Sequence, residues 1–251
     1  MNTVVLQSHR LPLPAPWLAR CLDSVRGWAA RRGFEYRFED DALFDRLPGD
    51  LRERTAGRPV IAADLARLAA CRAVLDEGAE AVVWVDADTL VIDAEGWLLP
   101  EDDYALGREV WVQRDGGRVR DYVKVHNAYL LFRPGNPFLD FYHHAAERIV
   151  RAHRGPMAPQ LIGPKLLTAL HSLAQCPVDE RAAVLPPAVA HDLLAGGGDA
   201  LTRFRARSVA APAALNLCGS LVGRELDVDA LVAVMDRLAS NPALLAPRAR
   251  R

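Results

Sequence analysis

Two aspartates one residue apart, Asp86 and Asp88, carry the clearest chemical signal in the sequence. They follow the apolar run 82–85 and lead into a second apolar run, 90–92. A run rich in valine is typical of a buried central strand of a parallel sheet. Buried carboxylates that lack partners cost several kcal/mol, so they need cationic or hydrogen-bonding compensation. Mn²⁺ or Mg²⁺ bound to a diphosphate would supply it, because hard cations prefer oxygen ligands. The plainer alternative is a strand that runs into an Asp-rich turn.

A second polar pair lies on the segment before that strand. Asp64 and Arg67 are three residues apart, so they share one face of a predicted helix. In a binding site, Asp64 would accept hydrogen bonds from sugar hydroxyls and Arg67 would donate to sugar or phosphate oxygens. The alternative is an ion pair on the helix surface, which contributes only a few tenths of a kcal/mol. The residues alone leave these two interpretations open.

A third polar position, Asn216, interrupts the apolar segment 213–218. Such an amide often satisfies backbone groups, but its oxygen could also complete a metal or phosphate site. Lys165, like Arg67, could place positive charge beside a leaving phosphate. The sequence has no P-loop and no Gly-x-Gly-x-x-Gly after a strand, which counts against ATPase and dinucleotide-binding functions.

The elements around these residues alternate between strands and helices. We expect strands at 3–7, 34–38 and 82–85, separated by helices at 17–31 and 61–76, the first of which ends at Gly33. This alternation predicts an α/β fold with a mainly parallel sheet flanked by helices. Residues 40–54 are polar and are expected to be irregular.

The second half of the chain predicts a hairpin followed by helices. The segments 111–113 and 122–125 flank Asp115-Gly116-Gly117, whose composition predicts a turn. We expect a buried strand at 127–132, helices at 137–152 and 161–173, and a C-terminal helix that begins after Asp227. Together with the first half, these elements predict a single domain over residues 1–251.

Composition limits the class of protein. Hydrophobic residues make up 51% of the chain and charged residues 25%, which predicts a folded globule. A net charge of −1 disfavours nucleic acid as a partner. We expect no membrane span, no secretion signal, four buried thiols in a reducing cytoplasm, and a solvated basic tail at about 246–251.

Four motifs in order resemble a known family. They are Ala63-Asp64-Leu65-Ala66-Arg67, the strand with the DXD motif at 83–88, the strand and turn at 127–138, and Gly163-Pro164 with the helix start at 165–168. From about Ile61 to Ser220 this order resembles the DXD-motif sugar transferases. These include initiation mannosyltransferases, capsular polysaccharide enzymes and clostridial glucosylating toxins.

The resemblance implies a GT-A fold and a metal-dependent glycosyltransferase, expected here in a bacterial cytoplasm. It would move a hexose-type sugar, with retention, from a nucleotide-sugar donor to a hydroxyl acceptor. The donor would be a UDP-sugar or, less favoured, a GDP-sugar, and the acceptor a glycan, a lipid-linked molecule or a small molecule. The cofactor would be Mn²⁺ or Mg²⁺.

The resemblance also assigns roles to single residues. Asp88 would bind the metal directly, and Asp86 would contact the donor ribose and the metal shell. Asp64 and Arg67 would hold the donor sugar. The remaining site residues are Asn127 beside the sugar pocket, Gly163 and Lys165 at the donor, and Asn216 as a metal ligand where many relatives have a histidine.

Two other functions remain open at this stage. A nucleotidyltransferase that activates a sugar phosphate would share the α/β build, but it needs a Gly-rich basic loop after the first strand. Residues 7–12 contain no glycine. A catalytically inactive relative that serves as an interaction module is favoured by Asn216 and disfavoured by the presence of Asp64, Arg67, Asp86 and Asp88.

Overall fold

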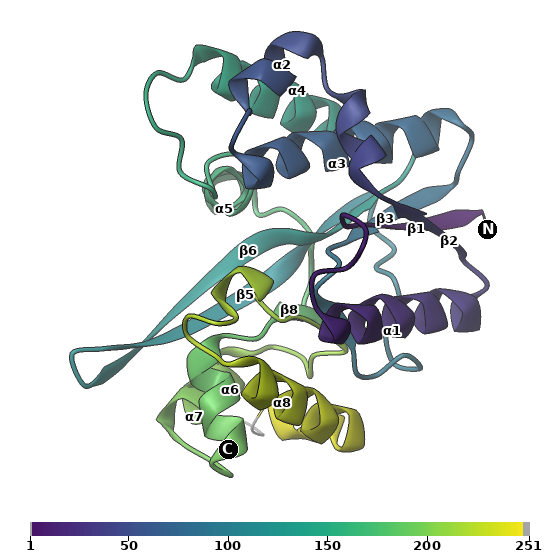
Figure 1. The fold of residues 1–251 in the computed structure, drawn as a ribbon. Coiled ribbons are helices and arrows are strands. Elements are labelled where there is room, and N and C mark those ends of the chain that lie inside the picture. The colour runs from purple at the N-terminus through teal and green to yellow at the C-terminus, as the bar shows by residue number, and fades with distance from the viewer. Residues whose placement is uncertain (1, 248–251) are drawn as a thin grey trace.

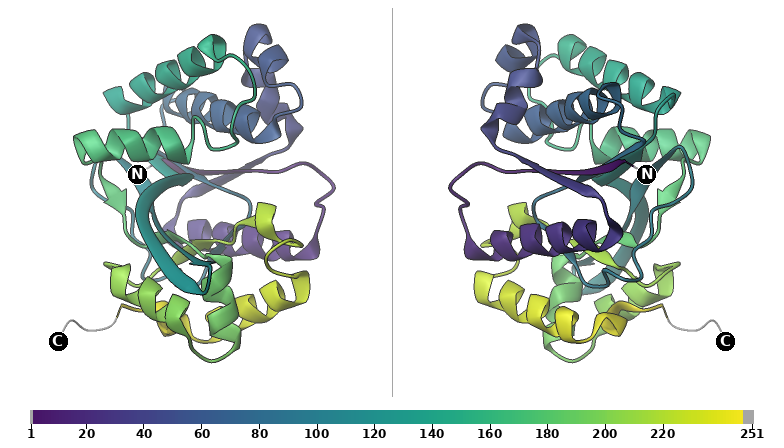
Figure 2. Two further views of the ribbon diagram at one scale, coloured as in Figure 1. Left: turned by 90° about the vertical axis from the view of Figure 1, so that its left-hand side faces the viewer. Right: turned by 90° about the vertical axis from the view of Figure 1, so that its right-hand side faces the viewer.

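The computed structural model describes residues 2–247 and has three layers (Figure 1). A twisted central sheet separates two groups of helices. Helices α2 to α5 cover one face, and α1 with α6 to α8 covers the other; the side views in Figure 2 show the same division. Most of the basic tail predicted at 246–251 falls outside the described residues.

The central sheet is mixed and mainly parallel, as predicted. Its six strands lie in the order β2 (Glu35–Glu39), β1 (Thr3–Ser8), β3 (Ala81–Val85), β6 (Arg118–Phe132), β5 (Tyr104–Asp115) and β7 (Val178–Asp179). Strand β1 is parallel to β2 and β3, and β5 is parallel to β7, whereas β6 is antiparallel to both of its neighbours. The carboxyl ends of β1 and β3 therefore meet at one edge, beside the middle of β6.

A small second sheet brings the late part of the chain to that edge. It has the order β4 (Thr89–Val91), β9 (Ala214–Asn216) and β8 (Ala182–Val184). In its register Thr89 lies opposite Asn216. The turn 86–88 connects the two sheets, so Asn216 is held next to the two aspartates.

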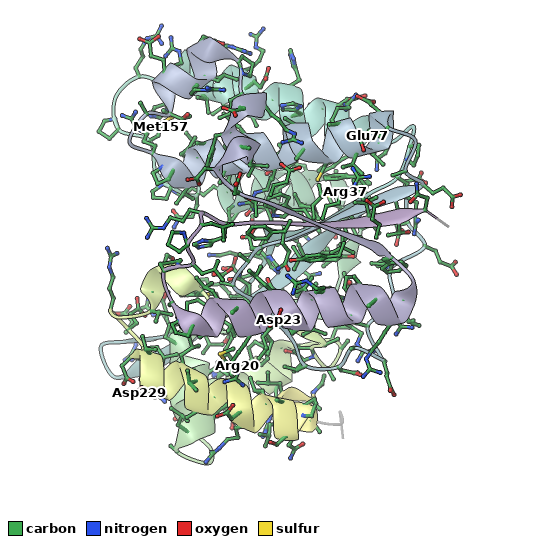
Figure 3. All side chains as sticks on the ribbon, turned by 45° about the vertical axis from the view of Figure 1, so that its right-hand side comes forward. Arg20, Asp23, Arg37, Glu77, Met157 and Asp229 are labelled. Atoms are coloured by element: carbon green, nitrogen blue, oxygen red, sulfur yellow. The ribbon has the colours of Figure 1, made fainter. Side chains whose placement is uncertain are left out.

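The helices begin and end where the sequence provides caps. Helix α1 (Pro16–Arg32) begins at a proline and ends at Gly33, whose φ of 69° lets its N–H reach the carbonyls of the last turn. Helix α3 (Pro59–Asp76) precedes β3, and α8 (Val228–Ser240) is capped by the side chain of Asp227. Figure 3 labels Arg20 of α1, which forms an ion pair of 2.6 Å with Asp236 of α8.

The prediction of an irregular segment at 40–54 is wrong. It forms the 3-10 helix η1 (Asp41–Arg46) and helix α2 (Gly49–Arg54), and Asp40 caps the first by accepting from the Ala42 N–H. The physical reason is a four-residue spacing of leucines in an otherwise polar stretch. Leu43, Leu47 and Leu51 are all buried against the core.

The remaining helices complete the two outer layers. They are α4 (Pro137–Ala152), α5 (Pro164–Ala174), α6 (Pro187–Leu194) and α7 (Asp199–Arg207), with the short 3-10 helices η2 (Gly219–Leu221) and η3 (Pro242–Leu245). Three of the four thiols are buried as predicted, but Cys218 is partly exposed because it stands in a turn at the start of η2. Within residues 2–247, no helix combines the length and apolarity that crossing a membrane requires.

Strands β5 and β6 form a long hairpin that projects beyond the rest of the sheet, here called the arm (Figures 1 and 2). The sequence predicts two separate strands at 122–125 and 127–132, whereas β6 is one continuous strand of 15 residues. The partner strand carries a register shift between Leu106 and Gly107. Gly107 lies directly against the His126 ring, and a Cβ there would come within 2.3 Å of it.

Candidate functional site

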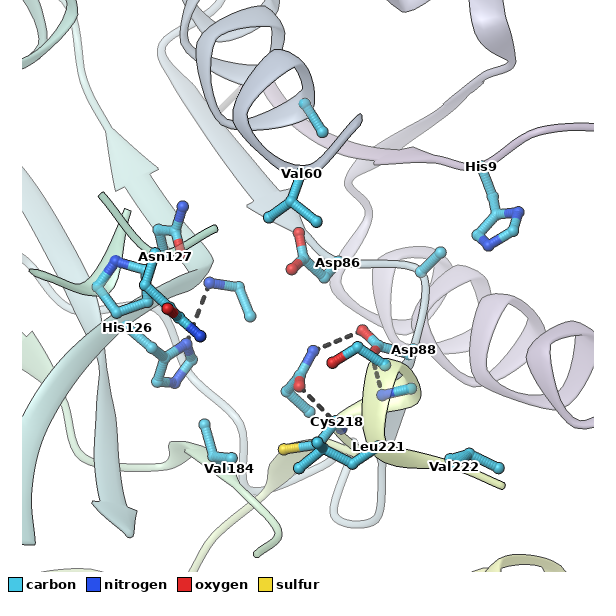
Figure 4. Close-up of a pocket in the computed structure, with 18 of the residues that line it drawn as sticks. His9, Val60, Asp86, Asp88, His126, Asn127, Val184, Cys218, Leu221 and Val222 are labelled. Carbon is cyan, nitrogen blue, oxygen red and sulfur yellow. Dashed lines mark hydrogen bonds between the residues drawn. The ribbon is translucent and has the colours of Figure 1, made fainter. Parts of the chain in front are cut away.

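A large cleft opens at the edge where β1 and β3 end. Its volume is about 1540 Å³, and its lining comes from residues as distant in sequence as Ser8 and Val228. Sites for single small ligands usually measure about 300–1,000 Å³. The cleft therefore has room for more than one small ligand. Figure 4 shows Asp86 and Asp88 on its wall, with Asn127 and His126 on the opposite side.

Asp88 is held rigidly on the wall of the cleft. Its Oδ1 accepts a hydrogen bond of 2.5 Å from the Asn216 amide, and its Oδ2 accepts one of 2.7 Å from the Gly219 N–H. Burial, followed by the nearby charge of Asp86, raises the pKa of Asp88 to about 6. Both effects oppose the ionised carboxylate, so a cation beside it would relieve an existing electrostatic cost.

Asp86 is more open than Asp88. Its side chain is 26% exposed, and its Oδ1 contacts Arg67 at 2.9 Å and accepts from the Trp84 indole N–H at 2.7 Å. Both of these contacts reach the same carboxylate oxygen. Its backbone N–H donates to the Ala128 carbonyl at 2.8 Å, which ties the turn to β6. The arrangement orients Asp86 toward the cleft through fixed donors behind it.

Arg67 is the cation that connects the two sides of the site. Besides Asp86, its guanidinium contacts Asp64 at 3.1 Å and donates to the Asn127 carbonyl at 2.6 Å. It also stacks over the Trp84 ring, 5.1 Å from the ring centre. Arg67 and Asp64 are both buried, so the alternative of an ion pair on the helix surface is wrong. Arg67 still lines the cleft.

Asp64 and Gly163 lie behind the cleft wall. Neither residue is part of the lining, whereas Arg67, Asn127 and Lys165 are. Asp64 Oδ1 accepts from the Asn127 amide at 2.7 Å, while its Oδ2 is buried and has no hydrogen-bond partner. Burial raises the pKa of Asp64 to about 6. In this geometry Asp64 positions Arg67 and Asn127, and its predicted contact with a donor sugar stays a prediction.

Gly163 gives Asp64 and Asn127 the space that they occupy. A Cβ at Gly163 would lie 2.7 Å from Asp64 Oδ2 and 2.8 Å from the Asn127 amide nitrogen. Gly163 therefore has a packing role, because only a residue without a side chain fits there. Its predicted contact with the donor stays a prediction. Lys165 follows on the first turn of α5 and faces the cleft.

Asn216 connects Asp88 to the following turn. Its amide oxygen accepts a hydrogen bond of 3.0 Å from the Cys218 N–H, and its amide nitrogen donates to Asp88. Asn216 thus holds Asp88 in place and also lines the cleft. Its predicted role as a metal ligand stays a prediction, because an amide oxygen has a second lone pair.

Two neighbours of the aspartates escaped the sequence analysis. Trp84 stands two residues before Asp86, and residues at this spacing in a strand face the same side. This periodicity could have indicated the contact between the Trp84 indole and Asp86. Gly219 acts through its backbone N–H, for which the sequence carries no side-chain signal. His126 also lines the cleft, but its Nε2 bonds to the Ala182 carbonyl and its Nδ1 to the Ala128 N–H.

The residues present fit a divalent cation that is shared with a ligand. Asp86 and Asp88 are hard oxygen donors on one wall of the cleft. Among residues 2–247, no group of three or more His, Cys, Asp and Glu side chains gathers as a metal site. Mg²⁺ and Mn²⁺ characteristically bind through one or two carboxylates and take their other ligands from phosphates and water. Two carboxylates beside a large cleft match that pattern.

Comparison with known proteins gives a limited result. No family model matches the chain, and no curated protein matches it. Among solved structures, the galactosyltransferase LgtC, in complex with donor and acceptor sugar analogues, is similar at 17% identity, with 95% of each chain covered and a TM-score of 0.48.

A second similar structure is a glycosyltransferase involved in the glycosylation of the major capsid of PBCV-1. The identity is 10%, the TM-score is 0.37, and the match covers 61% of this chain and 75% of that one. A third, A197 from STIV, is 12% identical with a TM-score of 0.30, and covers 71% of this chain and 80% of that one. At these identities and TM-scores, the likenesses assign neither family nor activity.

Proposed function

We propose that this chain is a metal-dependent glycosyltransferase of the GT-A type. It transfers a hexose-type sugar from a nucleotide-sugar donor, with a UDP-sugar favoured over a GDP-sugar, to a hydroxyl group of an acceptor. The observation that carries the proposal is the pair of carboxylates, Asp86 and Asp88, fixed on the wall of a cleft of about 1540 Å³. Retention of the anomeric configuration, a cytoplasmic location and a bacterial source complete the proposal.

The chain's own residues divide the work of binding the donor. Asp88 and Asp86 would hold Mn²⁺ or Mg²⁺, which when bound acts as a Lewis acid on the leaving diphosphate. Arg67 and Lys165 line the same cleft and supply positive charge where negative charge develops. Asn127 lies beside Arg67, and its backbone carbonyl fixes the guanidinium.

The test is a thermal-shift panel of nucleotide sugars with and without Mn²⁺. We expect one donor class to raise the melting temperature only when metal is present, because a ligand that binds the folded state stabilises it. Asp88→Asn should remove at least nine-tenths of the metal-dependent shift. Asp23→Asn is the matched control, because Asp23 is an exposed aspartate of α1 outside the cleft.

The proposal fails if no nucleotide sugar stabilises the protein in the presence of metal. It also fails if Asp88→Asn responds to donor and metal as the unaltered protein does. Either result would favour an interaction module. Analysis of the product's anomeric configuration by NMR then checks retention separately.

A further inference from the structure

The inner face of the arm presents an unusual set of side chains to the cleft. Trp111 of β5 lies directly opposite Tyr122 of β6. Two residues further along each strand, toward the aspartates, Glu109 lies opposite Lys124. Alternate residues of a strand face the same side, so these four share one face. All four line the cleft. The arm therefore extends the site away from the aspartates.

The outer face of the arm is used for packing. Val110 and Val112 are buried against the layer formed by α6 and α7. Asp121 pairs with Arg203 at 3.2 Å and with Arg207 at 2.7 Å, both from α7. The arm is thus attached to the body of the protein by one face, and its aromatic face remains open to ligands.

The chemistry of the open face suits a carbohydrate. Tyr122 is 39% exposed, and the Trp111 indole is fixed by a hydrogen bond of 3.0 Å from its N–H to the Gln113 side chain. Flat aromatic rings provide apolar contact for the C–H face of a pyranose, and amide, carboxylate and ammonium groups beside them bond to hydroxyls. A cross-strand aromatic pair by itself only stabilises a hairpin, by roughly 0.2–1 kcal/mol.

The position of the aromatic pair sets the length of the ligand. Ala128 contacts the backbone of Asp86, and Tyr122 lies six residues before it on the same strand. The regular part of β6 from Tyr122 to His126 spans about 13 Å at about 3.3 Å per residue. The register shift between Leu106 and Gly107 shortens the remainder, so the pair is roughly 15 Å from the aspartates. A single sugar ring cannot contact both places, whereas an extended chain of several sugars can.

From these observations we infer that the acceptor is an oligosaccharide of several units that stacks on Trp111 and Tyr122 and extends along the arm to the aspartates. This inference rests on the proposed function, because it names the acceptor of that reaction. Glu109 and Lys124 would contact hydroxyls of the sugars between the two places.

The test uses an array of immobilised glycans from one to eight units. The unaltered protein is expected to bind glycans of several units and to leave monosaccharides unbound. Trp111→Ala should lower the apparent affinity at least tenfold, and Trp111→Phe should recover much of it because the ring is kept. Val123→Ala is the matched control, because Val123 is exposed on the outer face of the same arm. It should bind as the unaltered protein does.

The inference is overturned if no glycan binds, if monosaccharides bind as well as longer chains, or if Trp111→Ala and Val123→Ala bind equally. The donor panel of the preceding section, repeated on Trp111→Ala, separates the two proposals. If the donor raises the melting temperature in the presence of metal but no glycan binds, only the proposed acceptor is rejected. If the donor causes no such rise in the unaltered protein, the proposed transferase function itself is rejected. Circular dichroism at the assay temperature verifies that each variant is folded.

Discussion

Asp88 illustrates how backbone and side chain share the task of fixing one carboxylate. Its partners, Asn216 and Gly219, reach both oxygens, and burial keeps water from competing with them. Asp86 is instead held from one side by Arg67 and Trp84. The sequence predicts that the two aspartates belong together. The partners of Asp88, however, lie 128 and 131 residues later in the chain and cannot be found from local pattern.

Gly163 provides a prediction about this buried network. Gly163→Ala would place a methyl group against Asp64 and Asn127, and overpacking of this kind costs about 1–3 kcal/mol. We expect a lower free energy of unfolding and weaker donor binding, because Asn127 must move. Urea denaturation and donor titration would measure the two effects.

The control for this substitution is Gly27→Ala. Gly27 lies on the exposed side of α1, and a Cβ there meets nothing within 4 Å. Alanine is favoured over glycine inside a helix by roughly 1 kcal/mol, so this variant should be more stable than the unaltered protein. Equal effects of the two substitutions would contradict the packing role of Gly163.

His126 provides a prediction about pH. Burial lowers the pKa of His126 to about 4 from an ordinary value of 6.5, while the nearby Asp86 raises it and Arg67 and Arg108 lower it. Below pH 6.5 the unfolded chain binds a proton that the folded protein does not. The stability contributed by this residue is therefore complete above pH 6.5 and is lost as pH falls toward 4, by about 3 kcal/mol.

The measurement is the free energy of unfolding of the unaltered protein and of His126→Gln between pH 7 and pH 4. The variant is expected to start lower, because it loses hydrogen bonds to Ala182 and Ala128, but to depend less on pH. Parallel curves for the two proteins would show that His126 does not titrate as described.

At the scale of elements, strong periodicity and caps predict the fold well. The helices α1, α3 and α4 and the strand β3 lie close to their expected ranges. The sequence does not predict how far β6 continues, because its outer half is mostly exposed and gains its partner only from β5. The short strand β9 is fixed by pairing with β4 and with β8, which no local propensity indicates.

The anchoring of the arm gives a prediction at this scale. Asp121→Ala removes the contacts with Arg203 and Arg207, so the arm should open more often while the rest of the fold is unchanged. Hydrogen exchange should show faster exchange confined to residues 108–125. Asp115→Ala is the control, because Asp115 stands at the exposed tip and its ion pair with Arg120 is 3.4 Å long. If both variants exchange alike, Asp121 is not the anchor.

At the scale of the whole molecule, the single domain predicted from the sequence remains a prediction with a direct test. Strand β6 contributes Leu130 to the hydrophobic cluster under α3 and Tyr129 to the cluster around Trp28 and Trp97, so one strand belongs to both sides of the sheet. We expect one cooperative unfolding transition. Coincident curves from tryptophan fluorescence and far-ultraviolet circular dichroism would confirm it, and two separated transitions would contradict it.

The hydrogen bonds of Asp88 also bear on how the protein is made. The two groups that hold this carboxylate come from Asn216 and Gly219, 128 and 131 residues later in the chain. During synthesis of the polypeptide, both of these residues follow β1 and β3, so Asp88 lacks them until the chain has reached Gly219. The centre of the cleft therefore depends on the late part of the chain, and a polypeptide that ends before Asn216 lacks both partners of Asp88.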